Sequence, residues 1–71
     1  MERSPVQSSN IASVGFDLTA SILEVEFVKG GIYQYSGVPE YIYQEFMSSG
    51  SKGQYFDQNI KKGSYPFAKV G

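Results

Sequence analysis

The residues best suited to hold a charged ligand lie between Ser49 and Gly53. Ser51 can cap the start of a helix, and backbone N–H groups at such a start attract anions. Lys52 adds a positive charge, and Gly53 has no side chain to block a close approach. The segment is not a Walker A loop, because the first glycine and the Lys-Ser/Thr pair of that motif are missing. It predicts an anion site, although ordinary helix capping would also explain Gly50 and Ser51.

Tyr55 and Asn59 lie four residues apart, so on a helix they share one side. Together with Lys52 they form a strip of charge, aromatic ring and amide, the mixture that stacks a base and holds a phosphate. The same strip is also typical of the half-exposed edge of an amphipathic helix. The run Ser8-Ser9-Asn10 forms a second candidate, since its side chains can bond a ligand or close a turn on their own backbone. The predicted ligand site comprises Ser9, Asn10, Ser51, Lys52, Gly53, Tyr55 and Asn59.

Catalytic chemistry is hard to assemble from this chain. It has no cysteine and no histidine, so it lacks the usual nucleophile, near-neutral base and zinc ligands. Glu24 and Glu26 form a carboxylate pair, but their spacing is typical of the solvent face of a strand. We therefore predict a protein that is not an enzyme, with no catalytic residues, no metal site and no cofactor.

The charges are divided unevenly along the chain. The net charge of −1 argues against a nucleic-acid binder driven by electrostatics alone. Residues 1–48 carry two basic and six acidic side chains, whereas residues 49–71 carry four lysines and one aspartate. A negatively charged ligand is therefore expected at the C-terminal third, although ordinary solvated lysines would give the same pattern.

Three stretches alternate between apolar and polar residues, as strands with one buried face do. They span residues 11–16, 22–28 and 32–36. In the first stretch, Ala12, Val14 and Phe16 share one face and Ile11 lies on the other. The glycine pair after Lys29 supplies the positive φ that a tight hairpin needs. These features predict a three-stranded antiparallel β-meander.

The period changes at Pro39, which suits the first turn of a helix. Ile42 and Phe46 stack at helical spacing and predict a helix over residues 40–48, and a second helix is expected over about 52–62. The whole is an α+β fold, a three-stranded antiparallel β-meander followed by a helical pair, in a single domain over 1–71. The predicted core consists of Leu23, Val25, Phe27, Ile42, Phe46, Phe56 and Ile60.

A chain of 71 residues is marginal as an isolated domain, because it buries only roughly 60% of its unfolded surface. Without disulfides or a metal, the remaining common source of stability is self-association, so we expect a homo-oligomer. No apolar stretch approaches the roughly 20 residues of a membrane span. The start of the chain is polar and unlike a signal peptide, so we expect no membrane association and a cytoplasmic location.

Fragments along nearly the whole chain resemble the KTSC family in their order and spacing. They are Pro5-Val6, residues 8–11, 13–17, 23–27 and 33–35, Val38-Pro39, residues 51–56, Asn59-Ile60 and Tyr65. Members of this family occur as free-standing bacterial and phage proteins and as a C-terminal piece of some lysyl-tRNA synthetases. The resemblance therefore implies a KTSC-like domain with an RNA-binding role. Phe16 departs from the tyrosine that the family often has there.

The residues and the resemblance together favour a non-catalytic module that binds a phosphate-bearing ligand, either a nucleotide or RNA. The occurrence of the family in phages allows a specific version, a small oligomeric protein that sequesters a nucleotide signal. The alternative is a protein–protein interaction module that binds through its exposed tyrosines and acidic sheet. Tyr33 and Tyr35, which share a strand face, are expected in the core or at an oligomer interface.

Overall fold

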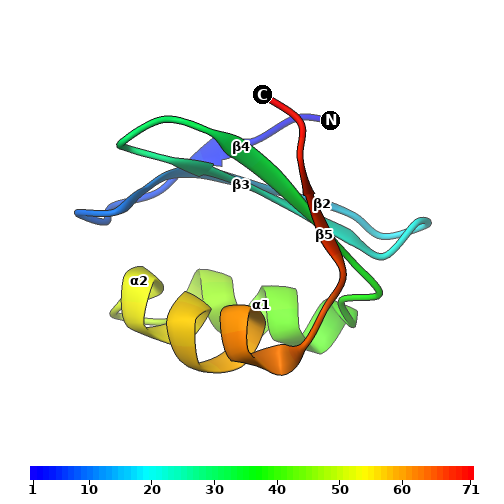
Figure 1. The fold of residues 1–71 in the computed structure, drawn as a ribbon. Coiled ribbons are helices and arrows are strands. Elements are labelled where there is room, and N and C mark those ends of the chain that lie inside the picture. The colour runs from blue at the N-terminus through cyan, green and yellow to red at the C-terminus, as the bar shows by residue number, and fades with distance from the viewer.

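The computed structural model, which describes residues 1–71, shows an antiparallel sheet with helices packed on one of its two sides (Figure 1). The strands follow the chain order across the sheet: β1 (Ser4–Pro5), β2 (Ile11–Asp17), β3 (Ile22–Phe27), β4 (Ile32–Ser36) and β5 (Phe67–Lys69). The predicted α+β class is confirmed, and so is the central meander. The prediction of three strands is wrong, because the sheet has five. The two additional strands are short and lie at its edges.

The predicted helical pair is present, but the second helix is not a regular α-helix. Helix α1 spans Glu40–Ser48. Helix α2 spans only Lys52–Tyr55, and the chain continues as a π-helical segment, η1 (Phe56–Ile60), and a 3₁₀ turn, η2 (Lys61–Gly63). None of these helices has the length and apolar character required to cross a membrane.

A β-bulge in β2 places two core residues on the same side of the sheet. Ile11 pairs with Phe27 and Ser13 pairs with Glu26, so Ala12 is the extra residue of the bulge. Ile11 and Val14 consequently both point to the helices, and each is only 1% exposed. The expectation that Ile11 lies on the face opposite Val14 is therefore wrong, because strict alternation does not hold across a bulge.

The core lies between the sheet and the two helical segments. Six of the residues predicted for the core are buried, whereas Phe27 is half-buried. Tyr35 and Val38 are buried as well, so Tyr35 belongs to the core. The ten buried residues of the core are Ile11, Val14, Leu23, Val25, Tyr35, Val38, Ile42, Phe46, Phe56 and Ile60.

The opposite face of the sheet carries a network of charged and polar side chains. The guanidinium of Arg3 donates to the carboxylate of Glu24 and, through Nε, to Oγ of Ser13 at 2.9 Å. Gln34 Nε2 donates to Glu24 Oε1 at 2.8 Å, and Ser13 Oγ donates to Glu26 at 2.7 Å. Glu24 is only 5% exposed, so its predicted place on a solvent face is wrong. The N-terminal segment covers it.

The hydrogen bond from Gln34, followed by the bond and charge of Arg3, holds the pKa of Glu24 below its ordinary value, although burial opposes this effect. Gly15 allows the covering segment to approach, because a Cβ there would collide with the carbonyl oxygen of Glu2. The network thus fastens the N-terminal strand to the middle of the sheet.

Candidate ligand-binding site

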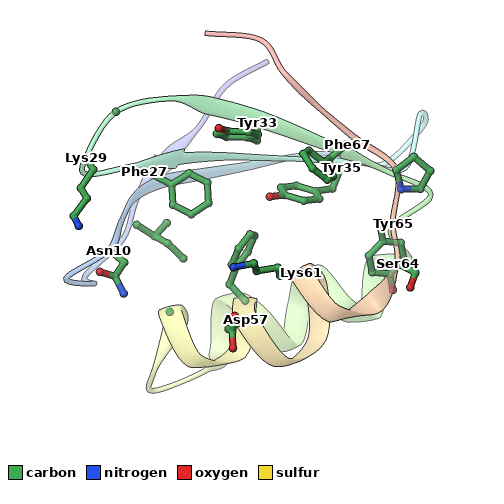
Figure 2. Close-up of a pocket in the computed structure, with 15 residues that line it drawn as sticks. Asn10, Phe27, Lys29, Tyr33, Tyr35, Asp57, Lys61, Ser64, Tyr65 and Phe67 are labelled. Carbon is green, nitrogen blue, oxygen red and sulfur yellow. The ribbon is translucent and has the colours of Figure 1, made fainter.

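A cavity of about 1170 Å³ opens between the sheet and the chain that follows α2 (Figure 2). Six of its fifteen lining residues are aromatic, and we call it the aromatic cleft; the charged residues Lys29, Asp57 and Lys61 line it too. The rings that line it are Phe27, Tyr33, Tyr35, Phe56, Tyr65 and Phe67. Contacts among them fix their orientation: Phe56 lies edge-on to Phe27 at 5.3 Å and to Tyr35 at 5.5 Å.

Tyr35 directs an unpaired hydroxyl into this cleft. The residue is only 7% exposed, and none of the side-chain hydrogen bonds within the chain involves its hydroxyl. No fully buried side-chain oxygen or nitrogen lacks a partner, so this hydroxyl must be accessible from the cleft, where Figure 2 shows it. Burial, and next the neighbouring Tyr33, raise the pKa of Tyr35 above its ordinary value. It therefore remains a hydrogen-bond donor at neutral pH.

Lysines lie along the rim of the cleft. Lys29 comes from the β3–β4 hairpin, and Lys61 comes from the helical layer. Within the π-helical segment, the N–H of Lys61 bonds to the carbonyl of Phe56, five residues earlier. This wide turn sets Lys61 one turn beyond Phe56, and both residues line the cleft. Neither lysine forms an ion pair, whereas Lys62 lies 3.8 Å from Asp57.

A second, smaller cavity of about 240 Å³ lies at the start of α2, and we call it the polar pocket. No hydrophobic residue lines it; its walls are Gln7, Ser8, Ser9, Asn10, Gly50, Ser51, Lys52, Gly53 and Gln54. Ser8 shapes one wall, since its Oγ accepts hydrogen bonds from the N–H groups of Asn10 and Ile11, both at 3.2 Å.

The two cavities adjoin, because Asn10 and Gly53 line both of them. A Cβ on Gly53 would lie 3.2 Å from Nδ2 of Asn10, which is tighter than an ordinary contact. A side chain at position 53 would therefore require the Asn10 amide to shift by a few tenths of an ångström. The polar turn before β2 and the start of α2, which are far apart in sequence, therefore form one continuous surface.

The polar pocket gathers most of the residues that the sequence proposed. Ser9, Asn10, Ser51, Lys52 and Gly53 all line it. The hydroxyl of Ser51 makes no capping hydrogen bond. Lys52 Nζ donates one hydrogen bond, to the carbonyl of Ser49 at 2.7 Å. Its other two N–H donors are not used within the chain.

Tyr55 and Asn59 line neither cavity. The Tyr55 ring stacks on Phe46 at 5.8 Å, and its hydroxyl donates to the carboxylate of Glu45 at 2.8 Å. Burial, and next this hydrogen bond, raise the pKa of Tyr55 to about 12. Asn59 Nδ2 donates to the carbonyl of Tyr55 at 3.2 Å. The structure thus separates these residues from the polar pocket and engages them within the helical layer.

Sequence reasoning missed the aromatic cleft as a site. It assigned Phe56 to the core, and it gave Tyr65 and Phe67 no role in binding. The local signal for the tail was weak, because Phe67 reaches the cleft only through the pairing of β5 with β4. Gly63 offers one clue, since a Cβ there would lie 2.7 Å from the Tyr65 ring that folds back over it.

Fold and cavities together define a small α+β domain with an aromatic cleft that continues into a polar pocket. The profile of the KTSC domain family matches residues 7–65, so the chain belongs to the KTSC family. It is also similar to the crystal structure of a KTSC domain protein from Yersinia pestis, with a TM-score of 0.93 and 48% sequence identity. That similarity covers 99% of this chain and 97% of the other.

Two curated relatives give the family context. An uncharacterized protein of Stutzerimonas stutzeri (strain A1501) is 37% identical over 99% of both chains. A lysine--tRNA ligase of Nostoc sp. is 38% identical over 78% of this chain, but that match covers only 10% of the ligase. The resemblance to a part of such ligases is therefore confirmed, and this chain corresponds to a small portion of their length.

Proposed function

We propose that this protein binds a nucleotide or a short RNA without transforming it, with a base in the aromatic cleft and a phosphate in the polar pocket. One observation supports this proposal above all: Asn10 and Gly53 join an aromatic cavity to a purely polar one. A nucleotide has the same division between a flat ring and a charged group. Binding would need both cavities at once.

The aromatic cleft offers the contacts that a base requires. Stacking on aromatic side chains contributes roughly 1–3 kcal/mol per base and tolerates any base identity. The unpaired hydroxyl of Tyr35 can donate to a ring nitrogen or carbonyl oxygen. Asn10 stands at the junction and offers both donor and acceptor atoms for the base edge or the sugar.

The polar pocket offers donors for a phosphate. Lys52 keeps two N–H groups for an anion while its third bonds to Ser49. Ser9 and Ser51 add hydroxyl groups from the two sides of the pocket. Charge-assisted hydrogen bonds of this kind are stronger than neutral ones, so Lys52 is the residue on which affinity should depend most in this pocket.

The lysines on the rim extend the proposal from one nucleotide to a chain. Lys29 and Lys61 are unpaired and lie along the open side of the aromatic cleft, where successive phosphates would pass. The related ligase is named for a reaction of tRNA, and this supports RNA as one version of the ligand. The other version of the ligand is a free nucleotide that acts as a signal. A small oligomer would then act simply by binding and retaining that nucleotide.

Calorimetric titration with adenosine, AMP, a dinucleotide and short single-stranded RNAs of each base tests the proposal. We expect the phosphorylated ligands to bind and adenosine to bind much more weakly. Lys52→Ala should reduce the binding free energy by roughly 1–3 kcal/mol, the scale of a charge-assisted hydrogen bond. Lys62→Ala is the control, because Lys62 lines neither cavity, and Asp57→Asn is measured beside it, because the ion-pair partner of Lys62 lines the aromatic cleft.

Equal dissociation constants for the two lysine variants would show that the phosphate does not bind in the polar pocket. Binding of adenosine as tightly as AMP would contradict the two-part site. A protein–protein interaction module remains the second candidate, and the exposed Phe67 on the edge strand β5 favours it.

A further inference from the structure

The outer edge of β5 carries hydrogen-bonding groups that the chain itself does not use. Ser36 N–H bonds to the carbonyl of Pro66 at 2.8 Å, and Val70 N–H bonds to the carbonyl of Ile32 at 2.7 Å. Backbone groups alternate in direction along an antiparallel strand. The N–H and C=O groups of Phe67 and Lys69 therefore point away from β4. No strand lies beyond β5, so these groups are open to another chain.

The side chains on this edge are exposed too. Phe67 is 64% exposed although it lines the aromatic cleft, and all three residues of β5 are exposed. Phe67 and Lys69 pair with Tyr35 and Tyr33, so both point to the cleft side of the sheet. The small Ala68 between them points to the other side.

We propose that β5 pairs with β5 of a second copy in antiparallel orientation, about a two-fold axis through Ala68. This register sets Phe67 opposite Lys69 of the second copy, and Lys69 opposite its Phe67. The outward N–H and C=O groups of both residues then meet their counterparts, and the open edges of both sheets close. Such a contact is self-complementary, as a two-fold interface requires.

The chemistry of the pair favours a second copy over an unrelated strand. A lysine on an exposed edge ordinarily discourages pairing. Opposite an exposed phenyl ring it becomes attractive, because an ammonium binds the ring face and the lysine stem covers apolar surface. Ala68 meets only Ala68 at the axis, where the Cα atoms of the two strands are about 4.5 Å apart.

Pairing would also change the aromatic cleft. The two sheets would continue into each other with their helices on the same side, so the two clefts would open next to each other. Lys69 of the second copy would lie beside Phe67 at the rim of the first cleft. The second copy would therefore add a cation to each binding site. Three residues per strand bury less than the roughly 1,200 Å² of a standard stable interface, so pairing should depend on protein concentration.

A cysteine at the axis tests the register directly. The chain has no native cysteine, so Ala68→Cys introduces a single thiol. Opposed residues at the axis would have their Cα atoms about 4.5 Å apart, within the range that a disulfide spans. Under mild oxidation we expect Ala68→Cys to form a disulfide-linked dimer rapidly. Leu18→Cys is the matched control, because Leu18 is 62% exposed in the turn between β2 and β3, two strands that do not pair with β5. Cross-linking of the two variants at equal rates would overturn the proposal.

Sedimentation velocity of two charge variants gives an independent test. Phe67→Glu sets a carboxylate opposite Lys69 of the second copy, whereas Phe67→Lys sets two ammonium groups against each other. We expect the wild type and Phe67→Glu to dimerise as concentration rises, and Phe67→Lys to remain monomeric. Equal loss of dimer in both variants would mean that the ring alone mediates association and that the register is wrong. A wild type that is monomeric at high micromolar concentration would overturn the proposal altogether.

Discussion

The two faces of the sheet differ in whether their polar side chains have hydrogen-bond or ion-pair partners within the chain. On the face without helices, Arg3, Ser13, Glu24 and Gln34 satisfy one another, and Glu24 is almost completely buried beneath them. On the helix-facing side, the hydroxyl of Tyr35 forms no hydrogen bond within the chain, and the two lysines of the aromatic cleft, Lys29 and Lys61, form no ion pair. Both faces belong to the same strands, so the difference lies in the side chains and in the segments that cover them.

This difference separates residues that serve folding from those available for binding. Polar groups that already have partners gain little from a ligand, because they would exchange one hydrogen bond for another. Groups without partners contribute no hydrogen bond to the fold, and they gain one when a ligand arrives. Substitutions that remove a polar group from the Arg3–Ser13–Glu24–Gln34 network should therefore alter stability, whereas removal of an unpaired polar group from the cleft should alter affinity.

The largest effect on stability is expected from Arg3→Ala. Removing Arg3 leaves a buried carboxylate that only Gln34 still bonds. We expect the free energy of unfolding to fall by about 2 kcal/mol, less than for a fully buried pair because the Arg3 side chain is 25% exposed. Urea denaturation measures this loss, and Lys29→Ala at the cleft rim is the control. Equal stability of both variants would contradict the contrast between the faces.

A smaller effect should appear on acidification. The lowered pKa of Glu24 means that its stabilising contribution is complete above the ordinary glutamate pKa of roughly 4.3. The contribution is lost as the pH falls from there through the lowered pKa. We expect Glu24→Gln to reduce the free energy of unfolding at pH 7 and to weaken its dependence on pH below about 4.3. Denaturant titrations from neutral to acidic pH compare the slopes. Parallel curves for the variant and the wild type would show that Glu24 is not the titrating group.

Local patterns predicted the central part of this fold well. Alternation over 22–28 and helical spacing of Ile42 and Phe46 depend on near neighbours, and the structure has β3 and α1 there. The edge strands were missed because two or three residues carry no detectable period. Their positions depend on pairing with distant segments, as in the register of Tyr35 with Phe67.

The candidate site shows the same limit. The polar pocket could be predicted because the hydroxyl of a serine, the charge of a lysine and the missing side chain of a glycine each suit anion binding whatever their surroundings. The aromatic cleft could not be predicted, since the sequence does not distinguish a phenylalanine or tyrosine in the core from one that lines a binding site. Lys61 lies near the end of the second helix that the sequence predicts, and the sequence gives no sign of the π-helical turn that precedes it or of its place in the cleft.

The smallest effect on stability, and the sharpest test of the contrast, is expected from Tyr35→Phe. This variant keeps the ring that packs edge-on to Phe56 and removes only the hydroxyl, which has no partner in the chain. The free energy of unfolding at pH 7 should stay within about 0.5 kcal/mol of the wild type, whereas a ligand that accepts a hydrogen bond from the hydroxyl should bind about 1 kcal/mol more weakly. Tyr55→Phe is the matched control: it removes a hydroxyl that bonds to Glu45 and lines neither cavity, so it should lower stability and leave affinity unchanged. Denaturation and calorimetry on both variants measure the two effects: we expect reduced affinity in Tyr35→Phe and reduced stability in Tyr55→Phe. A loss of stability in Tyr35→Phe with unchanged affinity would instead show that the Tyr35 hydroxyl serves folding.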